Sequence, residues 1–185
     1  MVETVYFPDR KGWRAWLSEN HQKKDEIWLI IPKQSSGYKR IPYNDSVEEA
    51  LCFGWIDSTL RPYDEHHTIQ RFSPRRKGSK YSQSNIERLR YLSQQGLLLP
   101  EVEHAVREIL QKEFTFPQDI LDEIKKDPIV WDNFQAFSDP YKRIRIAYID
   151  DARDRPDELN RRLNNFMKKT RENKTIGYGG IEKYY

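Results

Sequence analysis

The position of the strand-type segments constrains this chain more than any other feature. Three short runs rich in β-branched and aromatic residues, 26–31, 55–60 and 67–72, have the length and composition of strands. All of them precede Pro74. The last two are separated only by a turn, which predicts an antiparallel pair. The chain can therefore build a small sheet near its N-terminus, and no strand is expected after Pro74.

Helices are predicted on both sides of these strands. Asp9 can cap a helix that ends near residues 20–21, and Asn44 is placed to start a second helix that Gly54 would stop. Residues 38–43 are interpreted as a further short strand, limited by a proline. Together these elements predict an α+β fold with a small mixed or antiparallel sheet and flanking helices.

The second half of the chain shows helical periodicity throughout. Ser82 is a good N-cap for one helix, and Pro100 opens the next. A break near Phe114 suggests a boundary, so we predict an α+β domain over residues 1–114 and an all-α domain over 115–185. Residues 176–180 are expected to be a frayed end. Four helices of the second domain should each begin at a proline: Pro117, Pro128, Pro140 and Pro156.

Positive charge is concentrated in one stretch. The chain of 185 residues carries a net charge of +3. The segment RFSPRRKGSKYSQSN, residues 71–85, holds five cations and no acid, so the remainder sums to −2. A local excess of this kind says more about binding partners than the net charge does.

Several function classes lack support in the sequence. Cys52 lies in an apolar run and is expected to be a buried, inert thiol in a reducing compartment. The adjacent His66 and His67 would point to opposite faces of a strand and cannot chelate one metal from it. Nucleotide-binding glycine patterns and nucleophile motifs are missing, so we expect no cofactor, no metal and no catalytic residue. With neither a signal pattern nor a long apolar run, we expect a cytoplasmic protein without membrane insertion.

The basic stretch is the candidate ligand-binding site. It precedes a predicted helix N-terminus, where free N–H groups and serine hydroxyls favour an anion, and arginine binds phosphate or carboxylate with two parallel bonds. Trp55 and Asp57 share one face of a strand and could line the same pocket. The candidate ligand-binding residues are Trp55, Asp57, Arg71, Arg75, Arg76, Ser79, Tyr81, Ser82 and Asn85.

A structural alternative accounts for the same residues. Ser82 can act only as a helix cap and Trp55 only as core packing. Arg71 and Arg75 can pair with Asp57 and other acids, and Arg71 can meet Asp57 across neighbouring strands. In that case the stretch would stabilise the fold and bind nothing.

Several segments also resemble a known family. EEALCFGWIDS (48–58) followed by RFSPRRKGSKYSQSN (71–85) is similar to the signature of the YdeI/OmpD-associated, bacteriocin-protection family, and the segments 13–17 and 27–33 fit the same pattern. The tail from residue 127 to 169 resembles the family's helical C-terminal domain. Ser58 stands where the family usually has glycine, and Tyr81 where it has tryptophan. The resemblance implies a role in stress tolerance or in protection from bacteriocins and cationic peptides.

Three hypotheses remain open. The first is a non-enzymatic cytoplasmic protein that binds an anionic small molecule at the basic stretch. The second is a nucleic-acid-binding regulator that uses the same stretch, with Phe72 and Tyr81 as stacking surfaces. The third is an enzyme that acts on an anionic metabolite, for which Asp57 is the nearest general base. The oligomeric state is left open.

Overall fold

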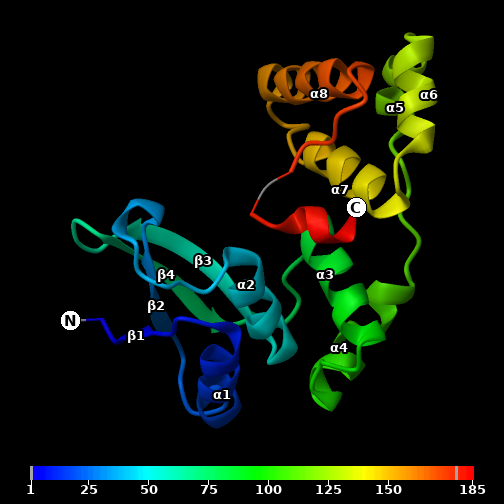
Figure 1. The fold of residues 1–185 in the computed structure, drawn as a ribbon. Coiled ribbons are helices and arrows are strands. Elements are labelled where there is room, and N and C mark those ends of the chain that lie inside the picture. The colour runs from blue at the N-terminus through cyan, green and yellow to red at the C-terminus, as the bar shows by residue number, and fades with distance from the viewer. Residues whose placement is uncertain (1, 178) are drawn as a thin grey trace. The chain divides into compact units, whose positions relative to one another are not determined.

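The computed structural model describes residues 2–177 and 179–185 and has an α+β architecture (Figure 1). It divides into two compact units, and each is described by itself. The sheet unit comprises residues 2–80 and Leu89–Arg107, and the helical unit comprises Tyr81–Arg88 and the described residues from Glu108 to Tyr185. The predicted domain boundary at residue 114 remains a prediction. The elements are β1 (Thr4–Tyr6), α1 (Arg10–Asn20), β2 (Ile27–Pro32), a 3₁₀ turn η1 (Gln34–Ser36), α2 (Tyr43–Cys52), β3 (Trp55–Pro62), β4 (His67–Pro74), α3 (Gln83–Gln94), α4 (Pro100–Gln111), α5 (Gln118–Lys125), α6 (Pro128–Ala136), α7 (Asp139–Asp150), α8 (Pro156–Arg171) and η2 (Ile181–Tyr184).

The sheet is mixed and has the strand order β1-β2-β4-β3. β2 and β3 both pair antiparallel with β4, which confirms the three predicted strands and their hairpin. β1 pairs parallel with β2 and was not predicted, because its three residues are too short to show an alternating pattern. The strand expected over residues 38–43 is wrong: this segment is irregular until α2 begins at Tyr43.

α1 and α2 pack on the face of the sheet that carries Phe72. The Asp9 side chain caps α1 by accepting a hydrogen bond from the Gly12 amide at 2.9 Å, as predicted. The Trp13 ring of α1 lies 5.2 Å from the Phe72 ring, and its indole N–H donates to the Ser46 carbonyl of α2 at 3.0 Å. One buried tryptophan thus joins both helices to the sheet.

A buried ionic network between α1 and α2 was not anticipated. The Glu48 and Glu49 side chains are 0% and 2% exposed. Arg10 pairs with both carboxylates, while Arg14 pairs with Glu49 at 2.6 Å. Asn44, which was expected to start α2, instead donates its side-chain amide to Glu48 at 2.6 Å. Buried carboxylates of this kind need such partners, because an unpaired charge is costly to remove from water.

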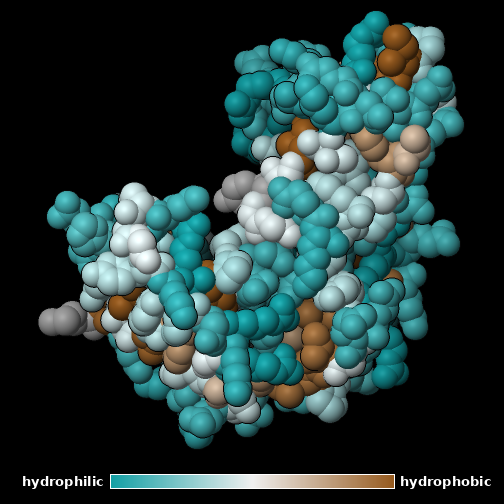
Figure 2. Space-filling view, viewed as in Figure 1, coloured by the Kyte–Doolittle hydropathy of each residue, from teal (hydrophilic) through white to brown (hydrophobic). Residues whose placement is uncertain are grey.

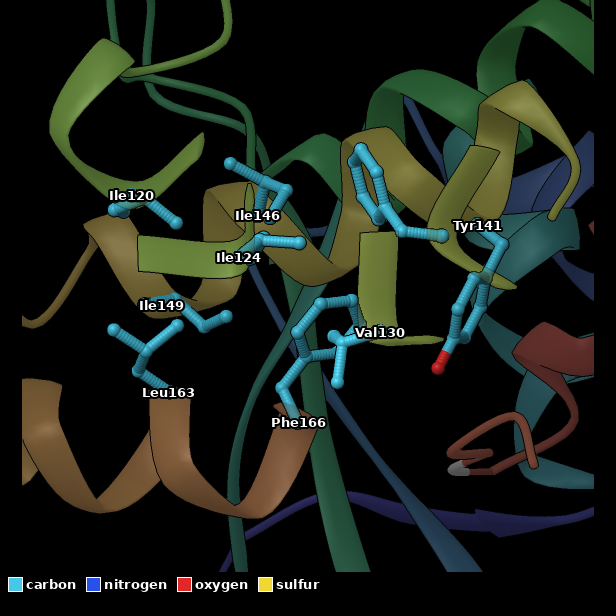
Figure 3. Packing of buried hydrophobic residues seen from close by; sticks show 9 residues of the cluster. Ile120, Ile124, Val130, Tyr141, Ile146, Ile149, Leu163 and Phe166 are labelled. Atoms are coloured by element: carbon cyan, nitrogen blue, oxygen red, sulfur yellow. The ribbon is translucent and has the colours of Figure 1, made fainter. Parts of the chain in front are cut away.

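The helical unit is organised around an apolar cluster from α5 to α8 (Figure 3). All four predicted proline-initiated helices are present. Asp127 and Ser138 cap α6 and α7 by accepting hydrogen bonds from backbone amides in the first turn. The cluster consists of Ile120, Ile124, Val130, Phe134, Tyr141, Ile146, Ile149, Leu163 and Phe166.

The end of the chain is tied to this core. Tyr141 accepts a hydrogen bond from the Ile176 amide at 3.1 Å, and the Tyr185 hydroxyl donates to the Ile176 carbonyl at 2.8 Å. Ile181 is buried. The expectation that residues 176–180 are frayed is therefore wrong for Ile176, and Tyr178 lies outside the described residues.

Hydrophilic residues cover most of the face of the molecule shown in Figure 2. Among the described residues, no helix has the length and apolar character needed to cross a bilayer.

Candidate anion-binding site

The nine candidate residues fall into both units. Trp55, Asp57, Arg71 and the loop residues up to Ser79 belong to the sheet unit. Tyr81, Ser82 and Asn85 belong to the helical unit. The two sets are therefore taken separately.

Trp55 lies in the core of the sheet unit. Trp55 is 1% exposed, and its ring packs edge-on against the Trp16 ring, with the ring centroids 6.0 Å apart. The indole N–H donates to the His21 carbonyl at 3.1 Å, so its only polar group is satisfied. This environment supports the packing interpretation over a ligand platform.

Asp57 and Arg71 do not pair across the strands. Asp57 lies opposite Phe72 in the ladder and accepts a hydrogen bond from the Tyr43 hydroxyl at 2.8 Å. Arg71 is one residue away in register, so it points to the other face of the sheet. There it binds Glu26, with a nitrogen–oxygen distance of 2.6 Å. The predicted cross-strand pair is wrong because of this alternation.

The segment Arg75–Lys80, here called the basic loop, is ordered by its own backbone. The Arg75 amide donates to the Gly54 carbonyl at 2.9 Å, and the Arg75 guanidinium donates to the Ser79 carbonyl at 2.8 Å. Ser79 in turn donates its hydroxyl to the Arg76 carbonyl at 2.7 Å. Gly78 has a φ of +79°, which favours glycine at this turn. Arg75 and Ser79 therefore shape the loop.

The other three cations of the basic loop point into solvent. Arg76, Lys77 and Lys80 are exposed. Their side chains make no hydrogen bond or ion pair with any residue that the structure describes. These three charges lie within five residues of an ordered turn and are available to an anion.

The three candidates in the helical unit lie around the start of α3. The Ser82 hydroxyl accepts a hydrogen bond from the Asn85 amide at 3.3 Å, which confirms its role as an N-cap. Asn85 accepts a hydrogen bond from Arg88 at 3.0 Å, and Tyr81 is half-buried. Capping and local packing account for the contacts of Ser82 and Asn85.

A cluster on the sheet unit was not found from the sequence. The Arg61 guanidinium lies 4.1 Å from the centre of the Trp28 ring. Glu26 accepts hydrogen bonds from the Trp28 indole at 3.2 Å and from Arg71 at 2.8 Å. The hydrogen bond from Arg71 lowers the pKa of Glu26. The register of β2 against β4 places Trp28 directly opposite Arg71, and the sequence alone does not give this register.

Groups that could support metal or thiol chemistry are absent or shielded in the part of the chain described. No cluster of three or more His, Cys, Asp or Glu residues suited to a metal ion occurs among the described residues. Cys52 is buried, and burial raises the pKa of its thiol to about 11. The thiol therefore stays protonated at neutral pH and is a poor nucleophile.

The two halves of the chain match two different protein families. Residues 5–105, more than half of the chain, match a family described as Domain of unknown function (DUF8412). Residues 113–173 match the family described as Bacteriocin-protection, YdeI or OmpD-Associated. No curated protein and no solved structure matched the chain. The motifs that carried the resemblance, residues 48–58 and 71–85, lie within the first match, whereas the helical tail carries the second. The chain therefore belongs to the DUF8412 family, and its helical tail, over residues 113–173, carries a match to the bacteriocin-protection, YdeI or OmpD-associated domain.

Proposed function

We propose that this protein is a binding protein that captures anionic ligands through the basic loop. The observation that carries the proposal is the set of three exposed side chains, Arg76, Lys77 and Lys80, on a turn that Arg75 holds in shape. A cation that is already in a surface ion pair gains little free energy from binding a further anion. Neighbouring cations that are unpaired repel one another. A bound anion relieves that repulsion, and the ordered backbone reduces the entropy lost on binding.

The ligand is held by charge on an open surface. All three side chains are exposed. Such a surface favours ligands with several negative charges spaced along a chain over a single carboxylate, because each contact in high dielectric contributes little. Phosphate-bearing ligands fit this requirement, since both arginine and lysine bind phosphate oxygens.

A role in protection from bacteriocins or cationic peptides is proposed from the family description. The basic loop would repel a cationic peptide, so direct capture of the peptide at this site is disfavoured. Protection would instead run through an anionic partner inside the cell, consistent with the proposed cytoplasmic location. A strain lacking the gene should be more sensitive to cationic peptides, and the loop variant described next should fail to restore tolerance.

The binding test uses inorganic tripolyphosphate as the probe and isothermal titration as the assay. The variant Arg76→Ser/Lys77→Ser/Lys80→Ser should lower affinity by about tenfold or more, with a shallower dependence of affinity on salt. The matched control is Lys11→Ser/Lys23→Ser/Arg107→Ser, which removes the same charge from exposed positions elsewhere on the sheet unit.

The control should bind like the wild type. An equal loss in both variants would show that only net charge matters, and the site assignment would fail. The absence of tripolyphosphate binding by the wild type at low salt would refute the proposed function itself.

A further inference from the structure

The face of the sheet opposite α1 and α2, here called the open face, carries the Trp28, Arg61 and Arg71 side chains. Trp28 and Arg71 lie opposite each other on neighbouring strands. Arg71 is the residue before Phe72, and because Phe72 faces α1, Arg71 and Trp28 face the other way. Arg61 follows an irregularity in β3 and stacks over Trp28. α1 and α2 contact the sheet from the other side, through the Trp13 ring of α1 and the Tyr43 hydroxyl of α2.

Positive charge gathers on the strands and loops that border the open face. Residues 26–43 and 58–80 hold nine Lys or Arg against three acids, giving +6, whereas the whole chain is +3. Glu26 pairs with Arg71, and the other two acids are adjacent in the hairpin turn, where Asp64 accepts hydrogen bonds from the His66 and His67 amides. This surface is therefore complementary to a polyanion. The nine cations are Lys33, Lys39, Arg40, Arg61, Arg71, Arg75, Arg76, Lys77 and Lys80.

Flat aromatic groups lie along the same surface. Trp28 is only 6% exposed, and the Arg61 guanidinium lies over its ring, 4.1 Å from the ring centre. Arg61 itself is exposed and forms no hydrogen bond or ion pair with the described residues; its interactions are this stack and a charge attraction to Glu26. At the hairpin end, the exposed Tyr38 ring stacks on His67 with centroids 5.7 Å apart.

These groups span the length of one strand. β4 contains eight residues from His67 to Pro74, a length of roughly 26 Å at the usual rise per residue. The His67–Tyr38 stack lies at its start, Arg71 lies within it, and the basic loop follows its end. Aromatic and cationic groups therefore alternate along a line long enough for several nucleotides.

We propose that the sheet unit binds single-stranded nucleic acid along the open face, with phosphates held by the basic loop, Arg61 and Arg71 and a base stacked at Trp28. The inference rests on the proposed function, because it names the class of anion that the basic loop captures. A base takes the place of Arg61 on the Trp28 ring, and the displaced guanidinium pairs with a phosphate or covers the base. Base–aromatic stacking beside a cationic groove is the usual way in which proteins hold single strands without reading sequence.

A single strand fits better than a duplex. In a duplex the flat faces of the bases are stacked on each other and cannot reach Trp28, so only the backbone charge would be used. Polyphosphate likewise offers charge without a flat group. The distinguishing property of this site is therefore a dependence on exposed bases.

The test measures fluorescence anisotropy of a labelled twelve-nucleotide oligothymidylate and of an abasic deoxyribose–phosphate oligomer of the same length. Both carry the same number of phosphates, so their affinities differ only through the bases. The oligothymidylate should bind at least fivefold more tightly, because one stacked base contributes about that much. The same oligomer annealed to oligoadenylate should bind less tightly than the single strand.

Variants assign the difference to Trp28. Trp28→Leu should bring the oligothymidylate down to the affinity of the abasic oligomer, while Trp28→Phe, which keeps a ring, should retain most of the difference. Binding of tripolyphosphate should be unchanged in both variants, which also shows that they are folded. Arg61→Ser, which alters no buried residue, should keep the preference for bases while flattening the salt dependence.

The outcomes separate the two proposals. Equal affinity for the oligothymidylate and the abasic oligomer, or a Trp28→Leu variant that keeps the difference, would overturn the nucleic-acid inference and leave anion binding by the basic loop intact. Failure of the wild type to bind tripolyphosphate and either oligomer would overturn both.

Discussion

Substitution of Arg10 tests whether the ionic network between α1 and α2 holds the sheet unit together. Arg10→Met removes the cation that Glu48 binds at 2.5 Å, and this carboxylate is 0% exposed. Burial opposes the charge on Arg10, yet its hydrogen bonds and charge interactions with Glu48 and Glu49 outweigh this and raise the pKa of the guanidinium. Stranding a buried charge costs about 3–5 kcal/mol. Because Glu48 keeps a bond from Asn44 at 2.6 Å, we expect a loss of about 3 kcal/mol, at the low end of that range.

Arg14→Met is the matched control. Arg14 pairs with Glu49, which still has Arg10 as a partner, and the Arg14 side chain is 37% exposed. No buried charge is stranded, so the loss should be about 1 kcal/mol or less.

Urea unfolding followed by tryptophan fluorescence is the appropriate assay. Four of the five tryptophans, at positions 13, 16, 28 and 55, lie in the sheet unit, so the signal reports mainly on that unit. A loss of 3 kcal/mol should lower the urea midpoint by about 1–3 M.

The double variant Arg10→Met/Glu48→Gln should recover most of the loss, since the neutral amide no longer needs a cation and can still bond to Asn44. Equal losses for Arg10→Met and Arg14→Met, or no recovery in the double variant, would refute the reasoning.

Three further predictions concern single groups. Burial raises the pKa of Cys52 to about 11, so Ellman's reagent at pH 8 should label it in 6 M urea and leave the native protein unlabelled; rapid labelling of the native protein would contradict its burial. Glu87→Gln should destabilise the helical unit by about 1–3 kcal/mol, because the hydrogen bond to Glu87 at 2.7 Å raises the pKa of Arg143 and the carboxylate is buried; an unchanged urea transition by circular dichroism would argue against it. The hydrogen bond from Arg71 lowers the pKa of Glu26 in the folded state, so its stabilising effect is present at pH 7 and is lost as the pH falls below the usual 4.5 and through the lowered pKa. Glu26→Gln should therefore melt below the wild type at pH 7, with a gap that narrows as the pH is lowered through that range, and a gap that stays the same size at low pH would contradict the pairing.

The helices could be predicted because their signals are local. Asp9, Ser82 and Ser138 cap helices within three residues of themselves, and prolines set the starts of the later helices. Such signals act between near neighbours and do not depend on the rest of the fold.

The strands were predicted only where they are long. β1 has three residues and exists because β2 offers it a parallel edge, which no local pattern reveals. Residues 38–43 have strand-type composition without strand structure. In both cases the outcome depended on whether a neighbouring strand was there to pair with.

The sequence showed which segment holds the candidate site, but it did not show which side chains of that site lie together in space. The concentration of cations after residue 70 was evident, and the three exposed side chains of the basic loop lie there. The predicted pairing of Asp57 with Arg71 was wrong because a single step in register moves a side chain to the other face. Trp28 was not predicted as a site residue, because the sequence of an apolar strand does not show which face of the sheet the helices leave free.

The sequence by itself determined the α+β class, the helices with their caps, and the place where positive charge gathers, because all three depend on composition or on contacts within a few residues. The tertiary structure decided which charged and aromatic groups are occupied. Arg75 and Arg76 are neighbours, yet one closes the loop and the other faces solvent. Trp55 and Trp28 both lie on strands, yet one is enclosed by the core and the other lies on the opposite face of the sheet beneath the exposed Arg61 side chain. Availability to a ligand depends on what packs against a side chain from distant parts of the chain, and only the folded arrangement of the strands and helices sets it.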